Sequence, residues 1–313
     1  MEPVKHRGAG MGRGLEGQGG MGMLVGLKGI LPMKIDLVDV FANGALSGNP
    51  LAVVHGADGL APEAMQRLAA WIGFSETVFL LAPQDAGADY RARIFTPTVE
   101  LPFAGHPTLG AAFAFVAAGG AVREGGVVQE CGVGLVPVRV EGVRVAFRAP
   151  EMRRDAALSA TERAEALALL GLDEGAVIEA VHADNGPPWK LFHLRDAAAL
   201  RGVSVTARGE PGTDLGLVAP SDLPGVDWEV RAFFAKAGGA MAEDPVTGSL
   251  NAGVARYLYG RGLAQGDYVA AQGMAVGADG RVYVSRDGEG IWIGGDVVMV
   301  AGGGDLDGGL SYK

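Results

Sequence analysis

The order of hydrophobic and polar positions predicts a chain that is rich in strands from residue 33 onward. In the first half, strand-like runs are KIDLVDVF (34–41), NPLAVVHG (49–56), SETVFLL (75–81) and YRARIF (90–95). Two alternating runs, GLVPVRV (134–140) and VRVAF (143–147), flank Glu141-Gly142 and predict a hairpin. In the second half, strands are expected around 188–195, 214–219, 228–235, 281–285 and 291–301.

Helical periodicity is confined to a few separated segments. Residues 62–73 begin with a proline, end with a glycine and carry apolar residues at helical spacing. Ser159 and Glu162 form a capping-box pattern ahead of a helix over 160–170. Two further helices are expected, over 108–118 and directly after Ser249. Many strands with few helices favour an α+β fold with mixed sheets over a doubly wound fold.

The first 32 residues differ from the rest of the chain. They contain ten glycines, and such a segment buries too little apolar surface to offset the entropy of ordering its backbone. We therefore expect residues 1–32 to be a disordered extension. The remainder is expected to form two halves, 33–148 and 149–313, with a return of the last strand to the first half left open.

Charge and composition exclude several classes of function. The net charge of −10 argues against a nucleic-acid surface, which needs clustered Lys and Arg. The sequence contains no run of about eighteen apolar residues, so no membrane-spanning helix is predicted. The single cysteine, Cys131, rules out an intrachain disulfide and a multi-cysteine zinc site, so a cytoplasmic location is expected by default.

A turn-and-helix pattern occurs twice, 143 positions apart. Each copy has a Pro-x-x-Gly turn followed by small and apolar residues, and the shift superposes Pro102 on Pro245, Gly105 on Gly248, Gly110 on Gly253 and Ala112 on Ala255. Helix N-termini attract carboxylates through free N–H groups and a partial positive charge. Two such ends at one cleft predict a small anionic ligand. The alternative for either turn alone is that His106 or Ser249 only caps its helix.

Three acidic residues near these turns are candidates for proton transfer. Glu76 interrupts an apolar strand-like run, where desolvation would raise its pKa into a useful range; a solvent-facing carboxylate on an edge strand is the alternative. Asp244 precedes Pro245, so its alternative is a turn or cap residue. Glu100 could serve only to tie the following turn. For His106, the roles of base, ligand and buried donor all remain open.

Five stretches of the chain resemble the PhzF-like family of phenazine-biosynthesis isomerases. They are DVFANGALSGNPLAVV, FSETVFL, RIFTPTVELPFAGHPTLGAA, NGPPW and AEDPVTGSLNAGVARYL. The resemblance runs from about Met33 to the C-terminus. It implies a diaminopimelate-epimerase-like fold, in which two pseudo-symmetric halves each wrap a mixed β-sheet around a central helix. The two turns would then contribute to one active site between the halves.

The resemblance also implies an activity and its residues. It implies an isomerase without cofactor or metal that moves a proton on a small carboxylate-bearing metabolite, and a homodimer. Glu76 would shuttle the proton, with His106 and Asp244 near the substrate. Substrate-binding residues would be Ser75, Gly105, Gly248, Ser249 and Asn49. Epimerase relatives of this fold use one cysteine from each half, but neither turn here has one, so a two-thiol racemase is excluded.

Two other functions remain compatible with the sequence. A binding protein for small acids could have the same cleft without turnover. A metal-assisted hydrolase could use His106 with two acids, although the five scattered histidines provide no metal-binding motif. No dinucleotide fingerprint or phosphate loop is present either.

Overall fold

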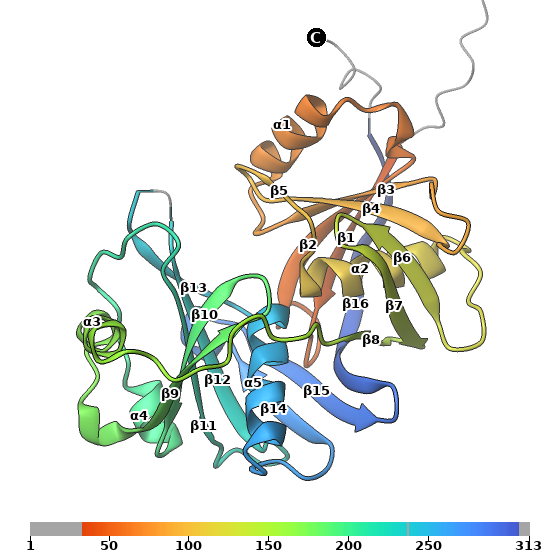
Figure 1. Ribbon diagram of the computed structural model, residues 1–313. Helices are drawn as coiled ribbons and strands as arrows, with labels where there is room; N and C mark the ends of the chain where they lie inside the picture. The colour runs from red at the N-terminus through yellow and green to blue at the C-terminus, as the bar shows by residue number, and fades with distance from the viewer. Residues whose placement is uncertain (1–32, 237, 307–313) are drawn as a thin grey trace, which may run out of the picture. The chain divides into compact units, whose positions relative to one another are not determined.

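The computed structural model describes residues 33–236 and 238–306 (Figure 1). The segment 1–32, for which disorder is expected, therefore lies outside the described residues. The strands of the first repeat are β1 (Met33–Val40), β2 (Asn49–His55), β3 (Thr77–Leu81), β4 (Tyr90–Phe95), β5 (Glu100–Leu101), β6 (Val127–Cys131), β7 (Gly134–Glu141) and β8 (Arg144–Arg148). Its helices are α1 (Pro62–Ile72) and α2 (Gly105–Ala117).

The second repeat has the same order of strands and, in addition, a helix ahead of its first strand. Its strands are β9 (Val177–Asp184), β10 (Pro188–Leu194), β11 (Asp214–Pro220), β12 (Trp228–Ala235), β13 (Met241–Asp244), β14 (Tyr268–Gln272), β15 (Gly280–Asp287) and β16 (Gly290–Leu306). Its helices are α3 (Ala160–Leu170), α4 (Ala197–Arg201) and α5 (Gly248–Gly260). Short 3-10 turns occupy Ala57–Gly59, Glu174–Ala176 and Met274–Val276.

Strand pairing shows that the two repeats have one topology. In the first, β1 and β2 are antiparallel, β2 and β3 parallel, β3 and β4 antiparallel, and β4 then pairs with β5 and, in parallel, with β6. In the second, β9 to β14 repeat these pairings in the same senses. The hairpins β6–β7–β8 and β14–β15–β16 complete the match. The repeat of small-residue turns therefore reflects a repeat of the whole fold.

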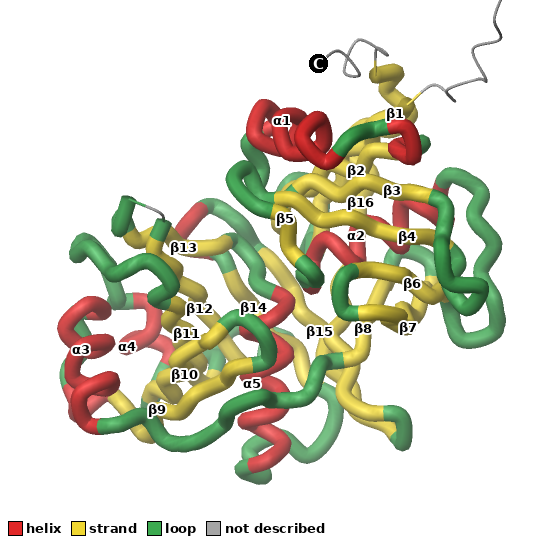
Figure 2. The backbone as a smooth tube through the Cα atoms, turned by 45° about the horizontal axis from the view of Figure 1, so that its top comes forward, coloured by secondary structure: helices red, strands yellow, loops and turns green. Residues whose placement is uncertain are grey.

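The strand β16 joins the two repeats. Its N-terminal part pairs with β15 and β8, and its C-terminal part pairs with β1. The strands β1, β2, β3, β4, β6, β7, β8 and β16 consequently form a closed ring. The helix α2 packs against strands all around this ring, and the tube view shows it enclosed (Figure 2).

Small residues allow a helix to fit inside the ring. In α2, a Cβ added to Gly110 would lie 2.4 Å from a methyl group of Leu51 on β2. In α5, the same addition at Gly253 would lie 3.0 Å from Ala183 on β9. Both helices contribute to one large apolar core, whereas α1 covers a separate core cluster and α3 and α4 cover another. The glycines and alanines of the two motifs are therefore packing residues as well as turn residues.

The predicted elements are largely confirmed, with definite corrections. The helix over 160–170 is present with its capping box, formed by Ser159 and Glu162. The helix expected over 108–118 begins at Gly105, because Pro107 lies in the first turn, where no N–H is needed. The strand expected from residue 75 begins at Thr77, so Glu76 precedes it. Strands β5, β6, β9, β13 and β14 and helix α4 were not predicted.

Candidate active site

The N-termini of α2 and α5 meet at two glycines. A Cβ added to Gly105 would lie 2.9 Å from the Cα of Gly248, and one added to Gly248 would lie 2.9 Å from the Cα of Gly105. Any larger residue at either position would push the two helix ends apart. The two turns that the sequence repeats are thus in backbone contact.

Neither helix start is capped by a side chain. The N-cap residues are Ala104 and Thr247, and neither makes a side-chain capping bond. The alternative in which His106 or Ser249 only caps a helix is wrong, since both lie within the first helical turn. Two uncapped N-termini in contact leave amide donors and partial positive charge at one place. This place suits an anionic ligand.

Glu76 stands beside this junction, directly before β3. Its Oε2 lies 3.5 Å from Nδ1 of His106, and the two side chains are 16% and 5% exposed. Oε2 of Glu76 and Nε2 of His106 are buried and have no hydrogen-bond partner among the described residues. Buried polar atoms are normally paired, so two unpaired ones at one place point to a ligand that would pair with them.

Burial changes the charge of both groups. It raises the pKa of Glu76 to about 8, with a further increase from the negative charge of Asp244. It lowers the pKa of His106 to about 3, and a hydrogen bond with the backbone of Pro50 raises this pKa only in part. Near pH 7 the carboxyl of Glu76 is mostly protonated and the imidazole is neutral. The contact between them is therefore not an ion pair, and the pKa of Glu76 lies in the range in which a carboxyl group can both take up and release a proton near pH 7.

Asp244, the last residue of β13, is held by a hydrogen-bond network. Its Oδ2 accepts from Thr247 Oγ1 at 2.5 Å and its Oδ1 from Asn49 Nδ2 at 3.3 Å. The buried Gln272 donates to the Asp244 carbonyl and to Thr247 Oγ1. Burial raises the pKa of Asp244 to about 6, and the bonds from Thr247 and Asn49 oppose this increase. The network fixes Asp244 close enough to Glu76 to influence its charge.

Ser249 is oriented by the loop that contains the NGPPW motif. Its Oγ accepts from Trp189 Nε1 at 3.0 Å, and its carbonyl accepts from Asn185 Nδ2 at 2.8 Å. Because the indole occupies one lone pair of the hydroxyl, the O–H of Ser249 remains available as a donor. Ser249 is therefore placed to donate to a ligand at the helix junction.

Of the remaining candidate residues, some lie at the junction of the two helices and others do not. Asn49 is fully buried and bonds Asp244 and the Val246 carbonyl, whereas Ser75 is exposed beside Glu76. Glu100 forms a two-pronged ion pair with Arg93, at 2.7 Å for both bonds. Cys131 is partly buried on β6, where its thiol donates to the Gly134 carbonyl. Glu100 thus joins β5 to β4 through Arg93 and, among the described residues, its side chain is not bonded to the turn that follows it.

Sequence reasoning missed several residues that build this site. They are the supporting polar residues Thr247, Gln272 and Asn251 and the Ser249 contacts Asn185 and Trp189. The polar triplet gives no pattern of its own, because Thr247 and Asn251 lie at the start of α5 whereas Gln272 lies on β14. For Asn185 and Trp189 there was a signal, since both belong to the NGPPW stretch.

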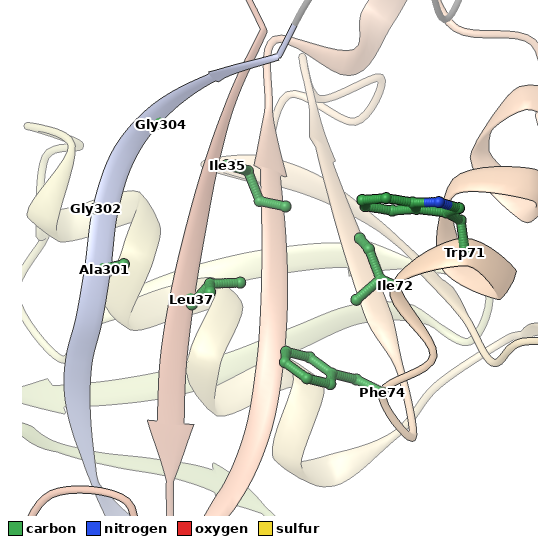
Figure 3. Close-up of a pocket in the computed structure, with 8 residues that line it drawn as sticks. All are labelled: Ile35, Leu37, Trp71, Ile72, Phe74, Ala301, Gly302 and Gly304. Atoms are coloured by element: carbon green, nitrogen blue, oxygen red, sulfur yellow. The ribbon is translucent and has the colours of Figure 1, made fainter.

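A separate apolar pocket of about 430 Å³ lies between α1 and the pair β1–β16 (Figure 3). It is lined by Ile35, Leu37, Trp71, Ile72, Phe74, Ala301, Gly302 and Gly304, and so includes none of the candidate residues. Within 33–236 and 238–306, no three His, Cys, Asp or Glu side chains are grouped as a metal site would require. Over the same residues, no helix is long and apolar enough to cross a membrane.

Comparison with known proteins relates the chain to one family. Residues 38–303 match the model of the phenazine biosynthesis-like protein family, PhzC-PhzF. The trans-2,3-dihydro-3-hydroxyanthranilate isomerase of Pseudomonas aeruginosa is 34% identical over 260 residues, 81% of this chain and 90% of that protein. Antisense-enhancing sequence 1 of Schizosaccharomyces pombe is 38% identical over 170 residues, which are 51% of this chain and only 57% of that protein.

A solved structure gives the same relationship. The PhzF-family phenazine biosynthesis protein of Bacillus anthracis superposes with a TM-score of 0.74 at 25% identity, over 88% of this chain and all of that one. The repeated topology and the helices in contact agree with the fold expected from the sequence. The chain therefore belongs to the PhzF-like, phenazine biosynthesis-like family, and it is an isomerase with an α+β, diaminopimelate-epimerase-like fold.

Proposed function

We propose that this isomerase moves a proton on a small carboxylate-bearing metabolite without a cofactor, and that Glu76 carries the proton. One observation carries the proposal: the Glu76 carboxyl, with a pKa of about 8 and an unpartnered Oε2, stands 3.5 Å from a neutral His106 at the helix junction. A single carboxyl group can remove a proton from one carbon and return it to another if it lies between them.

The charge at the helix ends sets the order of the steps. Protonating a carbon of the substrate first would place positive charge on its carbon skeleton next to two partly positive helix N-termini, which is unfavourable. Glu76 therefore begins as the carboxylate, the form of about a tenth of the molecules at pH 7 given its pKa of about 8. It takes a proton from carbon, an anionic intermediate forms, and the resulting acid returns the proton to a different carbon. The product is an isomer, and Glu76 is a carboxylate again.

The surroundings of Glu76 supply the donors that the anion needs. The first amides of α2 and α5 and the Ser249 hydroxyl are available at the junction. Neutral His106 adds Nε2, which has no partner among the described residues and donates in the tautomer that carries its single proton there. Donors that are fixed before the reaction stabilise developing negative charge without reorganisation. Asp244 has a different role, since its negative charge near Glu76 favours the protonated acid and so its formation from carbon.

The named relative suggests a probe for the substrate. The P. aeruginosa protein is named for trans-2,3-dihydro-3-hydroxyanthranilate, a small compound with a carboxylate. We expect the wild-type chain to incorporate deuterium from heavy water into this compound or into a related cyclic amino acid. Glu76→Gln should lower the rate by roughly 10²–10⁴-fold, the usual scale for a general acid–base group, while binding measured by calorimetry persists.

The control and the contrary result are well defined. Glu76→Asp retains the acid but withdraws it by one methylene, and it should lose activity because a misplacement of about 1 Å can cost about 10²-fold. Wild-type deuterium exchange in Glu76→Gln would exclude Glu76 as the carrier. Binding without any exchange in the wild type would show that the compound tested is not the substrate.

The proposal extends to the assembly and surroundings of the protein. We propose that the protein binds a small anionic metabolite, forms a homodimer and is located in the cytoplasm. Nucleic acid and membrane are not among its proposed partners. Light scattering should give about twice the chain mass of 32.0 kDa. A mass of one chain would remove the homodimer from the proposal.

A further inference from the structure

The repeated topology reveals a repeated ion pair. In the first repeat, Arg93 on β4 donates two bonds to Glu100 on β5, both of 2.7 Å. In the second, Arg231 on β12 donates two bonds to Glu243 on β13, of 2.9 and 2.7 Å. Strand register shows that the pairs are equivalent, because Glu100 faces Phe95 and Glu243 faces Phe233, two residues after each arginine. Each ion pair fixes the short strand that precedes a central helix, which is β5 before α2 and β13 before α5.

The two pairs differ in burial. The side chains of Arg231 and Glu243 are 9% and 8% exposed, whereas those of Arg93 and Glu100 are 17% and 41% exposed. The third guanidinium nitrogen of Arg231 also donates to the carbonyls of Leu200 and Val203, at the end of α4 and just after it. The pair in the second repeat is therefore a buried tie between β12, β13 and the chain at the end of α4.

The two pairs also differ in their neighbours. Glu100 is followed by Leu101, whose register partner on β4 is Ile94. Glu243 is followed by Asp244, whose partner on β12 is Ala232, the equivalent position. Only the second pair thus lies next to an acidic residue of the candidate site. The Glu243 charge raises the pKa of Asp244, and the Asp244 charge in turn raises that of Glu76.

We propose that Arg231 and Glu243 are positioning residues of the site: their ion pair holds β13 so that Asp244 faces Glu76, and it neutralises the charge next to Asp244. This inference rests on the proposed function only where it connects the pKa of Glu76 with proton transfer. The other charged or titratable groups nearby are Glu76, the neutral His106 and Arg201. Arg201 shares a pocket with Arg231 and Glu243 but is bound to Glu229 and Asp222.

A charge role predicts opposite shifts from the two partners. Glu243→Gln removes a negative charge and leaves Arg231 positive, so the apparent pKa values of Asp244 and Glu76 should fall by about half a unit or more. Arg231→Gln leaves Glu243 unpaired, so the same values should rise. Arg231→Lys retains the charge and should stay near the wild type. A purely structural role would not give shifts of opposite sign.

The first repeat supplies matched controls in the same chain. Arg93→Gln and Glu100→Gln break the equivalent pair next to Leu101, so they should leave both pKa values within about 0.2 units of the wild type. The measurement is a carboxyl carbon-13 NMR titration of the full-length chain and its variants. It needs no turnover, so it stays informative even if Glu76 proves not to carry the proton.

Two results would overturn the proposal. Shifts of the same sign in Arg231→Gln and Glu243→Gln would show that only structure was lost. If Glu100→Gln shifted the pKa values of Asp244 and Glu76 as much as Glu243→Gln does, the location of Glu243 next to Asp244 would be irrelevant. Arg231→Gln leaves the buried Glu243 carboxylate without its cation, which is strongly destabilising, so this variant could fail to fold. Glu243→Gln retains an amide oxygen that can still accept a hydrogen bond from Arg231, so it is the milder change. The comparison of Glu243→Gln with Glu100→Gln then decides alone, since a fall in the first only is expected.

Discussion

At the scale of single residues, the main feature of the candidate site is a carboxyl group with a raised pKa. Glu76 is largely buried and lies near the negative charge of Asp244, and both conditions disfavour its carboxylate form. Burial acts on His106 in the opposite sense, because it disfavours the imidazolium and leaves a neutral ring. A protonated acid and a neutral imidazole in contact require no counter-ion. Both remain free to interact with a substrate.

The raised pKa of Glu76 predicts a pH dependence of stability. The folded state binds the proton up to about pH 8, whereas the unfolded chain releases it near 4.5. The favourable contribution is therefore complete below pH 4.5 and is lost as the pH rises through 8, at about 1.4 kcal/mol for each unit of difference. Glu76→Gln removes this contribution. Urea unfolding should then show that the variant loses less stability than the wild type between pH 5 and 9.

The exposed Glu100 provides the control for this experiment. Glu100→Gln should leave the pH dependence of the wild type unchanged in the same range, since this side chain is 41% exposed and is paired with Arg93 instead of being desolvated beside Asp244. If wild type and Glu76→Gln lost stability in parallel between pH 5 and 9, the raised pKa of Glu76 would be contradicted.

At the scale of elements, the contact between two helix starts creates the site. The sequence predicted both helices and the anion-binding property of their N-termini, but it placed the start of α2 three residues late. The difference matters because it moves His106 from the turn into the helix. Its side chain then points from the first helical turn toward Glu76.

The glycines at this contact lead to a prediction about packing. Gly105→Ala and Gly248→Ala would each place a Cβ 2.9 Å from the Cα of the opposite glycine, and backbone atoms cannot yield as a flexible side chain can. Each should cost about 1–3 kcal/mol in unfolding free energy and reduce activity by separating the helix ends. Gly260→Ala is the control, because Gly260 lies at the other end of α5 and a Cβ added there would meet no atom within 4 Å. It should be neutral or stabilising by up to about 1 kcal/mol in thermal unfolding.

The control also defines the contrary result. If Gly248→Ala were as stable and active as Gly260→Ala, the close backbone approach at the junction would not be required. The explanation of the repeated glycines by contact would then be wrong.

At the scale of the whole molecule, β16 makes the two repeats depend on each other. The ring of the first repeat is closed by β16, the last strand of the second repeat. The predicted N-terminal half, 33–148, lacks this strand. Alone it would expose the hydrogen-bonding edges of β1 and β8, which invites aggregation.

This dependence can be tested by truncation. We expect residues 33–148 expressed alone to aggregate or to lack a cooperative thermal transition by circular dichroism, whereas 33–306 should unfold cooperatively. A folded, monomeric 33–148 fragment would contradict the role of β16 and would favour two independent domains.

The sequence by itself determined most elements, the repeat and the chemical candidates. Periodicity suffices for strands such as β4 and β12, and for the capping box of α3, because these signals lie in adjacent residues. Long motifs identified the family and with it Glu76, His106 and Asp244. Short or irregular elements such as β5 and β13 were missed, since two to four residues carry too little pattern.

Only the tertiary structure decided how these residues act. The raised pKa of Glu76 arises from burial and from Asp244, which lies 168 positions along the chain. Ser249 is oriented by Trp189, and Asp244 is held through Thr247 and Gln272, from three separate elements. The Arg231–Glu243 pair emerged only from strand register. Desolvation and hydrogen-bond geometry depend on distances between segments remote in sequence, so a pattern of neighbouring residues cannot determine them.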